Sequence, residues 1–332
     1  MSQKDDFGII ITASKYDYPF LEGCISSIYS SFDDIKVAIL CDGNFSTTFI
    51  SDFDSRIEII TKNSIEDPFL RNNSFGYGIT KMIAFWESPF EHFLLLDCDI
   101  ILWGSSALDK LFENKEDIQF SRWDKGEKDK KTVIKKWFFN PDYLRKEFRN
   151  IDFLKYYQQY SNTGVICAKR DVFNLEDYKT LLKLWHKNPK QFFIGGTDLA
   201  FINILLALGL EDQTLSASFN INETVSPAHS QELMKSKFSF KNGIPDVRES
   251  TFIHFSGYTK AFSSNSNAWV EPMTYFRRKF WSKTLNSNYL IEENIIKGDK
   301  RLIRTFQNNL TFRIKRKLIF HTSRLKKIIM QP

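Results

Sequence analysis

The sequence predicts an α/β protein in which a parallel sheet is flanked by crossover helices. Apolar runs rich in β-branched residues, Phe7–Ala13, Ile35–Leu40 and Arg56–Thr61, alternate with helical segments. This alternation is typical of parallel strands joined by helices. A longer apolar run, Phe93–Gly104, indicates a strand buried on both of its faces. The end of the chain differs: residues 277–332 contain 15 Lys and Arg against three acids, so we expect a basic extension after the sheet domain.

The remaining elements continue this pattern. A turn at Ser14–Pro19 is followed by a helix near Phe20–Ser31, a helix at Ile79–Trp86, a strand at Ser161–Ala168, a helix at Tyr178–His186, a helix from Gly195 to Leu208 and a last strand at Thr251–Phe255. Ligands of parallel sheets bind at the carboxyl ends of the strands. Thr12, Asp42, Asp97 and Asp99 fall at those ends, so we expect the functional site there.

Length and composition indicate a globular protein. The 332 residues suit one sizeable domain with appendages or two small ones, and 42% of them are hydrophobic. The amino terminus lacks the long apolar region of a signal peptide, and the longest apolar run, Leu199–Leu210, is shorter than the roughly 20 residues that span a bilayer. Four scattered cysteines are typical of free thiols in a reducing compartment. We expect a cytoplasmic protein without a membrane span.

The charge distribution bears on the class of partner. Outside the basic extension the chain has 31 Lys and Arg against 37 Asp and Glu. A nucleic-acid-binding protein would place basic residues around its central cleft as well. We therefore expect no nucleic-acid partner.

Two carboxylates lie within the apolar run Phe93–Gly104. A carboxylate in an apolar setting is costly unless it is paired, so Asp97 and Asp99 indicate a cation. Spaced two residues apart at the end of a strand, they point the same way and suit Mg²⁺ or Mn²⁺. The alternative is that the strand ends at Leu96 and that the two acids cap a turn or the next helix.

Residues 121–160 depart from the alternating pattern. A lysine-rich stretch, 125–136, precedes a set of rings at Trp137, Phe138, Phe139, Tyr143, Tyr156 and Tyr157. Such an insertion could be a lid over the site, for example an acceptor lid, whose rings offer flat faces to sugars or bases. The alternative is that the rings pack in the core.

Four separated pieces of the sequence resemble one family when they are taken in chain order. The first combines Ile79–Trp86, Leu94–Asp99 and Leu108–Phe112, and the others are Ser161–Val165, Gly195–Asp198 with Asn203, and His254–Lys260. Together they resemble the family-8 glycosyltransferases, which are glycogenin-like retaining enzymes, over roughly residues 7 to 262. The residue after Asp198 is Leu199, where the family has Gln, so the sequence leaves the catalytic group and the stereochemical outcome open.

The resemblance implies a GT-A fold, a Rossmann-like domain with a mixed, mostly parallel sheet, over residues 1–270. It implies a hexosyltransferase that binds a UDP-sugar donor and Mn²⁺ or Mg²⁺ and extends a glycan, either lipid-linked or part of a cell-surface polysaccharide. By position, the metal ligands would be Asp97, Asp99 and His254, the catalytic residues Asp198 and Asn162, and the nucleotide-binding residues Thr12, Ala13, Ser14, Arg71, Lys81, Asp97, Gly257 and Lys260.

Each of these roles has a structural alternative. His254 could be a packed core histidine, Arg71 a solvated loop charge, and Asp198 the N-cap of an apolar helix. At the level of the whole protein, a nucleotidyltransferase also combines such a sheet with a carboxylate-bound metal. Those enzymes carry a glycine-rich basic loop after the first strand, whereas Ser14–Pro19 contains no glycine. A noncatalytic sugar-binding or nucleic-acid-binding module is the third alternative.

Residues 271–332 are predicted to form a basic amphipathic helical tail. Apolar side chains recur at helical spacing at Leu302, Phe306, Leu310, Ile314, Leu318, His321, Leu325 and Ile328. The other face is basic, with Arg313, Arg316, Lys317, Arg324 and Lys327. This profile predicts a helix at an anionic membrane surface, where the enzyme would meet a glycolipid acceptor at the inner face of the membrane. The alternative is a helix docked on the catalytic domain.

Overall fold

The structure is a computed structural model of the chain. It describes residues 7–76, 78–112, 115–121, 129–148, 151–192, 197–256 and 269–304. The predicted positions Gly257 and Lys260, and the tail beyond Arg304, lie outside the described residues.

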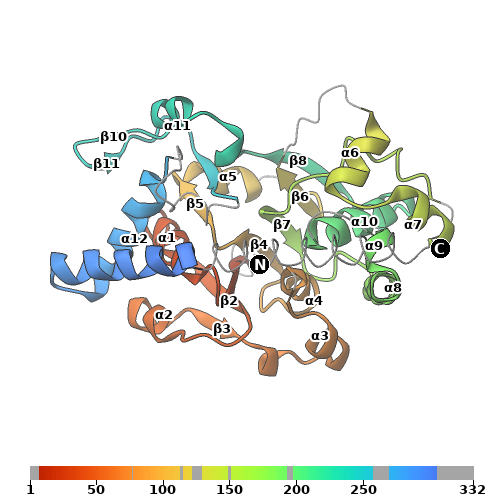
Figure 1. Ribbon diagram of the computed structural model, residues 1–332, viewed down its shortest axis with the longest axis horizontal. Helices are drawn as coiled ribbons and strands as arrows, with labels where there is room; N and C mark the ends of the chain where they lie inside the picture. The colour runs from red at the N-terminus through yellow and green to blue at the C-terminus, as the bar shows by residue number, and fades with distance from the viewer. Residues whose placement is uncertain are drawn as a thin grey trace, which may run out of the picture.

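The centre of the fold is a seven-stranded sheet (Figure 1). Its strands, in spatial order, are β3 Glu58–Ile60, β2 Lys36–Asp42, β1 Phe7–Ser14, β4 His92–Asp97, β7 Val165–Lys169, β6 Ile118–Ser121 and β8 Ala217–Ile221. Strand β7 runs antiparallel to β4 and to β6, and the other neighbouring strands are parallel. The mixed, mostly parallel sheet implied by the motifs is therefore confirmed.

A second sheet begins where the chain leaves β4. It contains β5 Ile100–Trp103, β12 Thr251–His254 and β9 Glu223–Val225, in the order β5-β12-β9. The prediction of one continuous strand over Phe93–Gly104 is wrong, because the chain turns at Cys98 and Asp99 and changes sheet. The run is apolar throughout because both halves are buried, each in a different sheet.

Helices cover both faces of the main sheet, and others lie beside the second sheet (Figure 1). They are α1 Tyr18–Tyr29, α2 Thr48–Phe53, α3 Pro68–Asn73, α4 Ala84–Glu87, α5 Ser106–Phe112, α6 Lys130–Trp137, α7 Pro141–Glu147, α8 Leu175–Lys187, α9 Pro189–Phe192, α10 Thr197–Glu211, α11 Gln231–Lys237 and α12 Glu271–Thr284. A short hairpin, β10 Phe240–Lys241 and β11 Ile244–Pro245, lies beside α11. The helix predicted at Ile79–Trp86 begins as a 3₁₀ turn, Ile79–Ile83, and continues as α4.

Successive side chains of a strand point to opposite faces, so the central strands build two cores. Along β4, Phe93 and Leu95 pack with residues of α8 and α10, whereas Leu94 and Leu96 pack with residues of α1 and α12. Helix α10 is apolar all round because it lies inside the first core.

The aromatic residues of the segment 121–160 belong mostly to that first core. Phe138, Phe139, Tyr156 and Tyr157 are buried, and Trp137 is 45% exposed. At these four positions the structure therefore agrees with the alternative, in which the rings pack in the core. A role of this segment as an acceptor lid stays a prediction.

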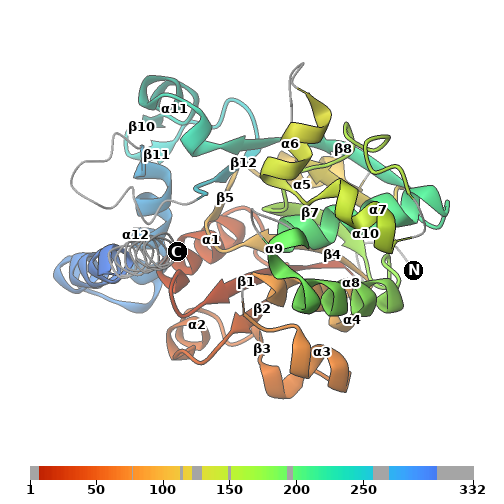
Figure 2. The same ribbon diagram turned by 45° about the vertical axis from the view of Figure 1, so that its right-hand side comes forward.

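The catalytic domain is predicted to end at residue 270, but the chain after it contributes to the second core, the one that contains Leu94, Leu96 and α1. Helix α12 lies beside α1, as Figure 2 shows, and it buries Met273, Phe276 and Phe280. Residues 288–304 are also helical, and Leu302 is fully buried in this core. Among the described residues no helix is long and apolar enough to cross a membrane.

Candidate active site

A cleft of about 390 Å³ opens at the carboxyl ends of the parallel strands. Thr12 to Ser14 of β1, Asp42 of β2 and Asp97 to Asp99 after β4 all line it. Because parallel strands end at the same edge, residues distant in sequence meet there. The strand-end residues Thr12, Asp42, Asp97 and Asp99 therefore line one cleft, and its role as the functional site stays a prediction.

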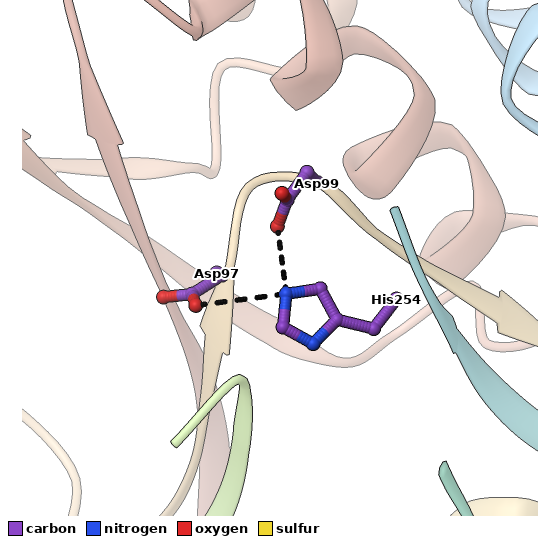
Figure 3. A group of neighbouring side chains, drawn as sticks. All are labelled: Asp97, Asp99 and His254. Carbon is purple, nitrogen blue, oxygen red and sulfur yellow. Dashed lines mark ion pairs between the residues drawn. The ribbon is translucent and has the colours of Figure 1, made fainter. Parts of the chain in front are cut away.

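Asp97, Asp99 and His254 form a compact group of oxygen and nitrogen donors (Figure 3). One donor atom from each residue lies within 4.8 Å of the other two. His254 Nε2 is 3.4 Å from Asp99 Oδ1 and 4.0 Å from Asp97 Oδ2. The pairing of β5 with β12 brings them together, because Ile100 is opposite His254 and Asp99 precedes it. Two carboxylates and one imidazole suit Mn²⁺ or Mg²⁺.

The electrostatics of this group agree with a cation site. Burial, with the neighbouring Asp99 carboxylate, raises the pKa of Asp97 to about 6 although Lys81 acts against it. Burial disfavours a charged His254, but Asp99 and Glu223 outweigh it and raise the pKa of the imidazole well above its usual value. A divalent cation would favour the ionised carboxylates and the neutral imidazole. The donor set therefore fits the metal that the motifs imply.

The second nitrogen of the His254 imidazole, Nδ1, contacts a different set of residues. This atom is 2.7 Å from Glu223 Oε1, and the same oxygen accepts a hydrogen bond of 2.9 Å from Asn162 Nδ2. Gly164 lies against the ring, where an added Cβ would be 2.5 Å from His254 Cε1. The predicted catalytic residue Asn162 thus contacts the partner of a metal-ligand candidate.

Lys81 connects the carboxylate group to the start of α10. Its Nζ is 2.5 Å from Asp97 Oδ1 and 2.9 Å from Asp198 Oδ2, although the side chain is almost fully buried. Thr163 Oγ1 donates to Asp198 Oδ2 at 2.8 Å. Burial opposes the ionised form of Asp198, but Lys81 and Thr163 hold the pKa of this carboxyl below its usual value. Asp198 is therefore an ionised group in the cleft.

Asn203 anchors the start of α10 to the segment before β7. Its side chain accepts from Ser161 N at 2.8 Å and donates to Ser161 O at 2.9 Å and to Leu199 O at 2.8 Å. These bonds give Asn203 a structural role. It fixes the first turn of α10, which places Asp198 in the cleft.

The loop after β1, residues 15–17, forms the other end of the cleft. Ser14 donates to Asp17 Oδ1 through its backbone N at 2.7 Å and its Oγ at 2.8 Å. Tyr16 also lines the cleft and is 53% exposed. Thr12 Oγ1 is buried and has no hydrogen-bond partner among the described residues. This end therefore offers an aromatic face and polar atoms.

The predicted residue Arg71 lies apart from these groups. It belongs to α3, and its Nη1 donates to Ile65 O at 3.3 Å. It is not among the described residues that line the cleft. Its nucleotide-binding role stays a prediction, as do those of Gly257 and Lys260.

Sequence reasoning missed Tyr16, Asp17, Thr163 and Glu223. Tyr16 and Asp17 follow a strand end, so the rule that ligands bind there could have found them. Glu223 lies in a short strand between polar residues, and no sequence pattern distinguishes it from an ordinary surface carboxylate.

Comparison with solved structures identifies the fold. The galactosyltransferase LgtC, solved with donor and acceptor sugar analogs, matches 85% of this chain and 98% of its own length at 14% identity and a TM-score of 0.52. The bifunctional glycosyltransferase WbbM matches 88% of this chain and 51% of its own at 11% identity and a TM-score of 0.50. No family model and no curated protein matches the sequence. The chain therefore has the GT-A fold of these glycosyltransferases, which confirms at the level of the fold the family-8 resemblance of its motifs.

Proposed function

We propose that the protein is a metal-dependent glycosyltransferase that moves a hexose from a UDP-sugar to a glycan acceptor with retention of configuration. One observation carries this proposal. The strand-end cleft of a GT-A fold is lined by Asp97 and Asp99, which form a donor group with the neighbouring His254, and by the Lys81–Asp198 ion pair. A diphosphate leaving group and a reacting sugar need these two kinds of group side by side.

Asp97, Asp99 and His254 would hold Mn²⁺ or Mg²⁺. When bound, such an ion neutralises the negative charge that develops on the diphosphate as the glycosidic bond breaks. Support comes from the donor chemistry and from His254, whose Nδ1 faces Glu223 while its Nε2 faces the two carboxylates. The predicted residues Gly257 and Lys260 would add to the diphosphate contacts.

Asp198 would act on the sugar. A glycosyl transition state carries positive charge at the ring, which an ionised carboxylate stabilises, either electrostatically or by forming a transient bond. Lys81 and Thr163 hold Asp198 ionised and in a fixed orientation. Because residue 199 enters this arrangement through its backbone, Leu199 is compatible with the proposed chemistry.

The loop after β1 would bind the nucleoside. The exposed ring of Tyr16 offers a face on which a uracil base can stack. Thr12, Ala13 and Ser14 line the same end of the cleft, and the buried Thr12 Oγ1 would gain a partner there.

We further propose that the acceptor is a lipid-linked or cell-surface glycan that the enzyme meets at the cytoplasmic face of the membrane. This part rests on the basic amphipathic tail. Each basic residue near an anionic surface contributes about 1 kcal/mol of attraction.

The test is a thermal-unfolding screen of nucleotide-sugars with and without Mn²⁺. A ligand that binds only the folded protein raises the melting temperature, so we expect a UDP-sugar with Mn²⁺ to raise it and chelation by EDTA to reverse the rise. Donor hydrolysis measured under the same conditions should show the same metal requirement. A protein stabilised by nucleoside triphosphates but by no nucleotide-sugar would instead fit a nucleotidyltransferase.

A further inference from the structure

We propose that Glu223, supported by Asn162, is the positioning residue of the metal site, since it fixes the orientation and the tautomer of His254. This inference rests on the proposed function, in which His254 is a metal ligand. It assigns a role to a residue that no motif marks, and it changes the role of Asn162 from catalytic to positioning.

The contacts place Glu223 behind the imidazole. Its side chain is 2% exposed, and its Oε1 lies 2.7 Å from His254 Nδ1, on the side of the ring opposite the donor atom Nε2. An ionised carboxylate only accepts hydrogen bonds. The Glu223 contact with Nδ1 is shorter than the 3.2 Å contact of Asn162 Nδ2 with the same atom. The geometry therefore favours a neutral His254 with its proton on Nδ1, which leaves the lone pair of Nε2 directed at Asp97 and Asp99. Metal-binding histidines commonly have such a carboxylate partner.

The position of Glu223 is fixed by the second sheet. Strands β9 and β12 are parallel, and Glu223 is opposite Phe252, two residues before His254. Side chains two residues apart on a strand share a face, so the carboxylate and the imidazole project from the same side. Thr251 Oγ1 donates to the preceding carbonyl, Asn222 O, at 2.7 Å and secures this register.

Asn162 and Gly164 complete the support. Asn162 Nδ2 donates to the same Glu223 oxygen at 2.9 Å, so the amide holds the carboxylate against the ring. An added Cβ at Gly164 would lie 2.6 Å from His254 Nδ1 and 3.2 Å from Glu223 Oε1. The segment from Asn162 to Gly164 therefore has two effects. It orients the Glu223 carboxylate, and the absence of a side chain at Gly164 leaves room for the His254 ring.

The experiment compares Glu223→Gln with a matched control, Glu249→Gln. The amide that replaces the Glu223 carboxylate can offer an N–H to Nδ1 and so favour the tautomer whose Nε2 is protonated and cannot bind a metal. Glu249 is a nearby exposed carboxylate that contacts Asn222 and Lys237. Its variant removes the same charge without touching His254.

The primary measurement is the Kd for Mn²⁺ of the full chain in the presence of UDP, by calorimetry. We expect Glu223→Gln to weaken Mn²⁺ binding by about 10- to 100-fold, with Glu249→Gln close to wild type. Donor hydrolysis by Glu223→Gln should recover at saturating Mn²⁺, which a misfolded protein would not do. Equal Kd values for the two variants would overturn the inference.

Asn162→Ala gives a second test that keeps the carboxylate in place. It should weaken Mn²⁺ binding by a smaller factor and be rescued in the same way by excess Mn²⁺. A loss of turnover at unchanged Mn²⁺ affinity would instead return Asn162 to a catalytic role and overturn its part in the inference. If the wild-type chain itself binds no Mn²⁺, the metal site of the proposed function is wrong, and this outcome is distinct from equal affinities among variants.

Discussion

At the scale of single residues, the candidate site depends on charges that are buried together. Lys81 is enclosed by Asp97 and Asp198, and His254 by Asp99 and Glu223. Removing one partner of such a pair leaves an uncompensated charge, so conservative variants are the informative ones.

Asp99→Asn should abolish metal-dependent turnover of the UDP-sugar without unfolding the protein. The variant keeps the size of the side chain but removes one anionic ligand, which should weaken metal binding. The measurement is donor hydrolysis as a function of Mn²⁺ concentration, with Asp109→Asn on the exposed face of α5 as the control. Wild-type activity of Asp99→Asn at limiting Mn²⁺ would show that the site is assigned wrongly.

Asp198→Ala should lower kcat by about 100-fold or more while changing the KM for the donor much less. This is the result expected of a group that acts mainly in the transition state. Because Asp198 lies in the first turn of α10, Asp198→Ser serves as the control for helix capping. The serine variant should recover thermal stability and leave the rate low. Recovery of both would leave Asp198 only a structural role.

At the scale of elements, a buried ion pair attaches the C-terminal helices to α1. Arg277 of α12 is fully buried, and its guanidinium contacts Glu22 Oε2 at 3.2 Å and Asp299 Oδ1 at 2.6 Å. Trp281 Nε1 donates to the same Glu22 oxygen at 3.0 Å. The cluster therefore connects α1 with two consecutive C-terminal helical segments that are far from it in the sequence.

Arg277→Met should lower the free energy of unfolding by roughly 3–5 kcal/mol, because it leaves the Glu22 carboxylate buried without its cation. The neighbouring Arg278 pairs with Glu292 and is 44% exposed, so Arg278→Met should cost less than about 1 kcal/mol. Adding Glu22→Gln to Arg277→Met should restore part of the loss. Denaturant unfolding of the four proteins measures these differences, and equal losses for the two arginine variants would contradict the assignment.

The last described turn of the chain also packs on the elements around α1. Leu302 is fully buried, and Arg301 donates to Lys15 O at 3.1 Å with its guanidinium 4.5 Å from the Tyr18 ring. A truncation of the predicted tail before Lys300 would therefore delete a core leucine and a contact to the loop that lines the cleft.

A truncation after Arg304 should therefore keep the wild-type melting temperature and donor affinity. A truncation before Lys300 should lower the melting temperature, because it removes the burial of Leu302. Thermal unfolding with and without UDP and Mn²⁺ compares the two proteins. Equal melting temperatures would mean that residues 300–304 do not contribute to the fold.

At the scale of the whole molecule, the charge asymmetry predicts where the protein is found. The chain up to residue 276 has more acids than bases, and the segment after it has a large basic excess. Full-length protein should bind anionic liposomes at low ionic strength and be released by high salt, since exposed charges are screened. The protein truncated after Arg304 should remain in solution and still hydrolyse the donor. Failure of the full-length protein to bind at low salt would exclude the peripheral-membrane role.

The sequence by itself determined the order of the strands and helices along the chain and indicated the central residues of the candidate site. Hydrophobic patterns are local, so β1, β2, α10 and β12 could be placed from them within a few residues. Asp97 and Asp99 could be recognised as a candidate cation site because carboxylates in an apolar run need a partner.

Only the tertiary structure decided which distant residues meet. The turn at Cys98 and Asp99, which moves the chain to a second sheet, leaves no gap in the apolar pattern, because both halves are buried. The contacts of Glu223 with His254 and of Arg277 with Glu22 join residues 31 and 255 positions apart. Local patterns carry no information on such contacts, since strand pairing and helix packing create them.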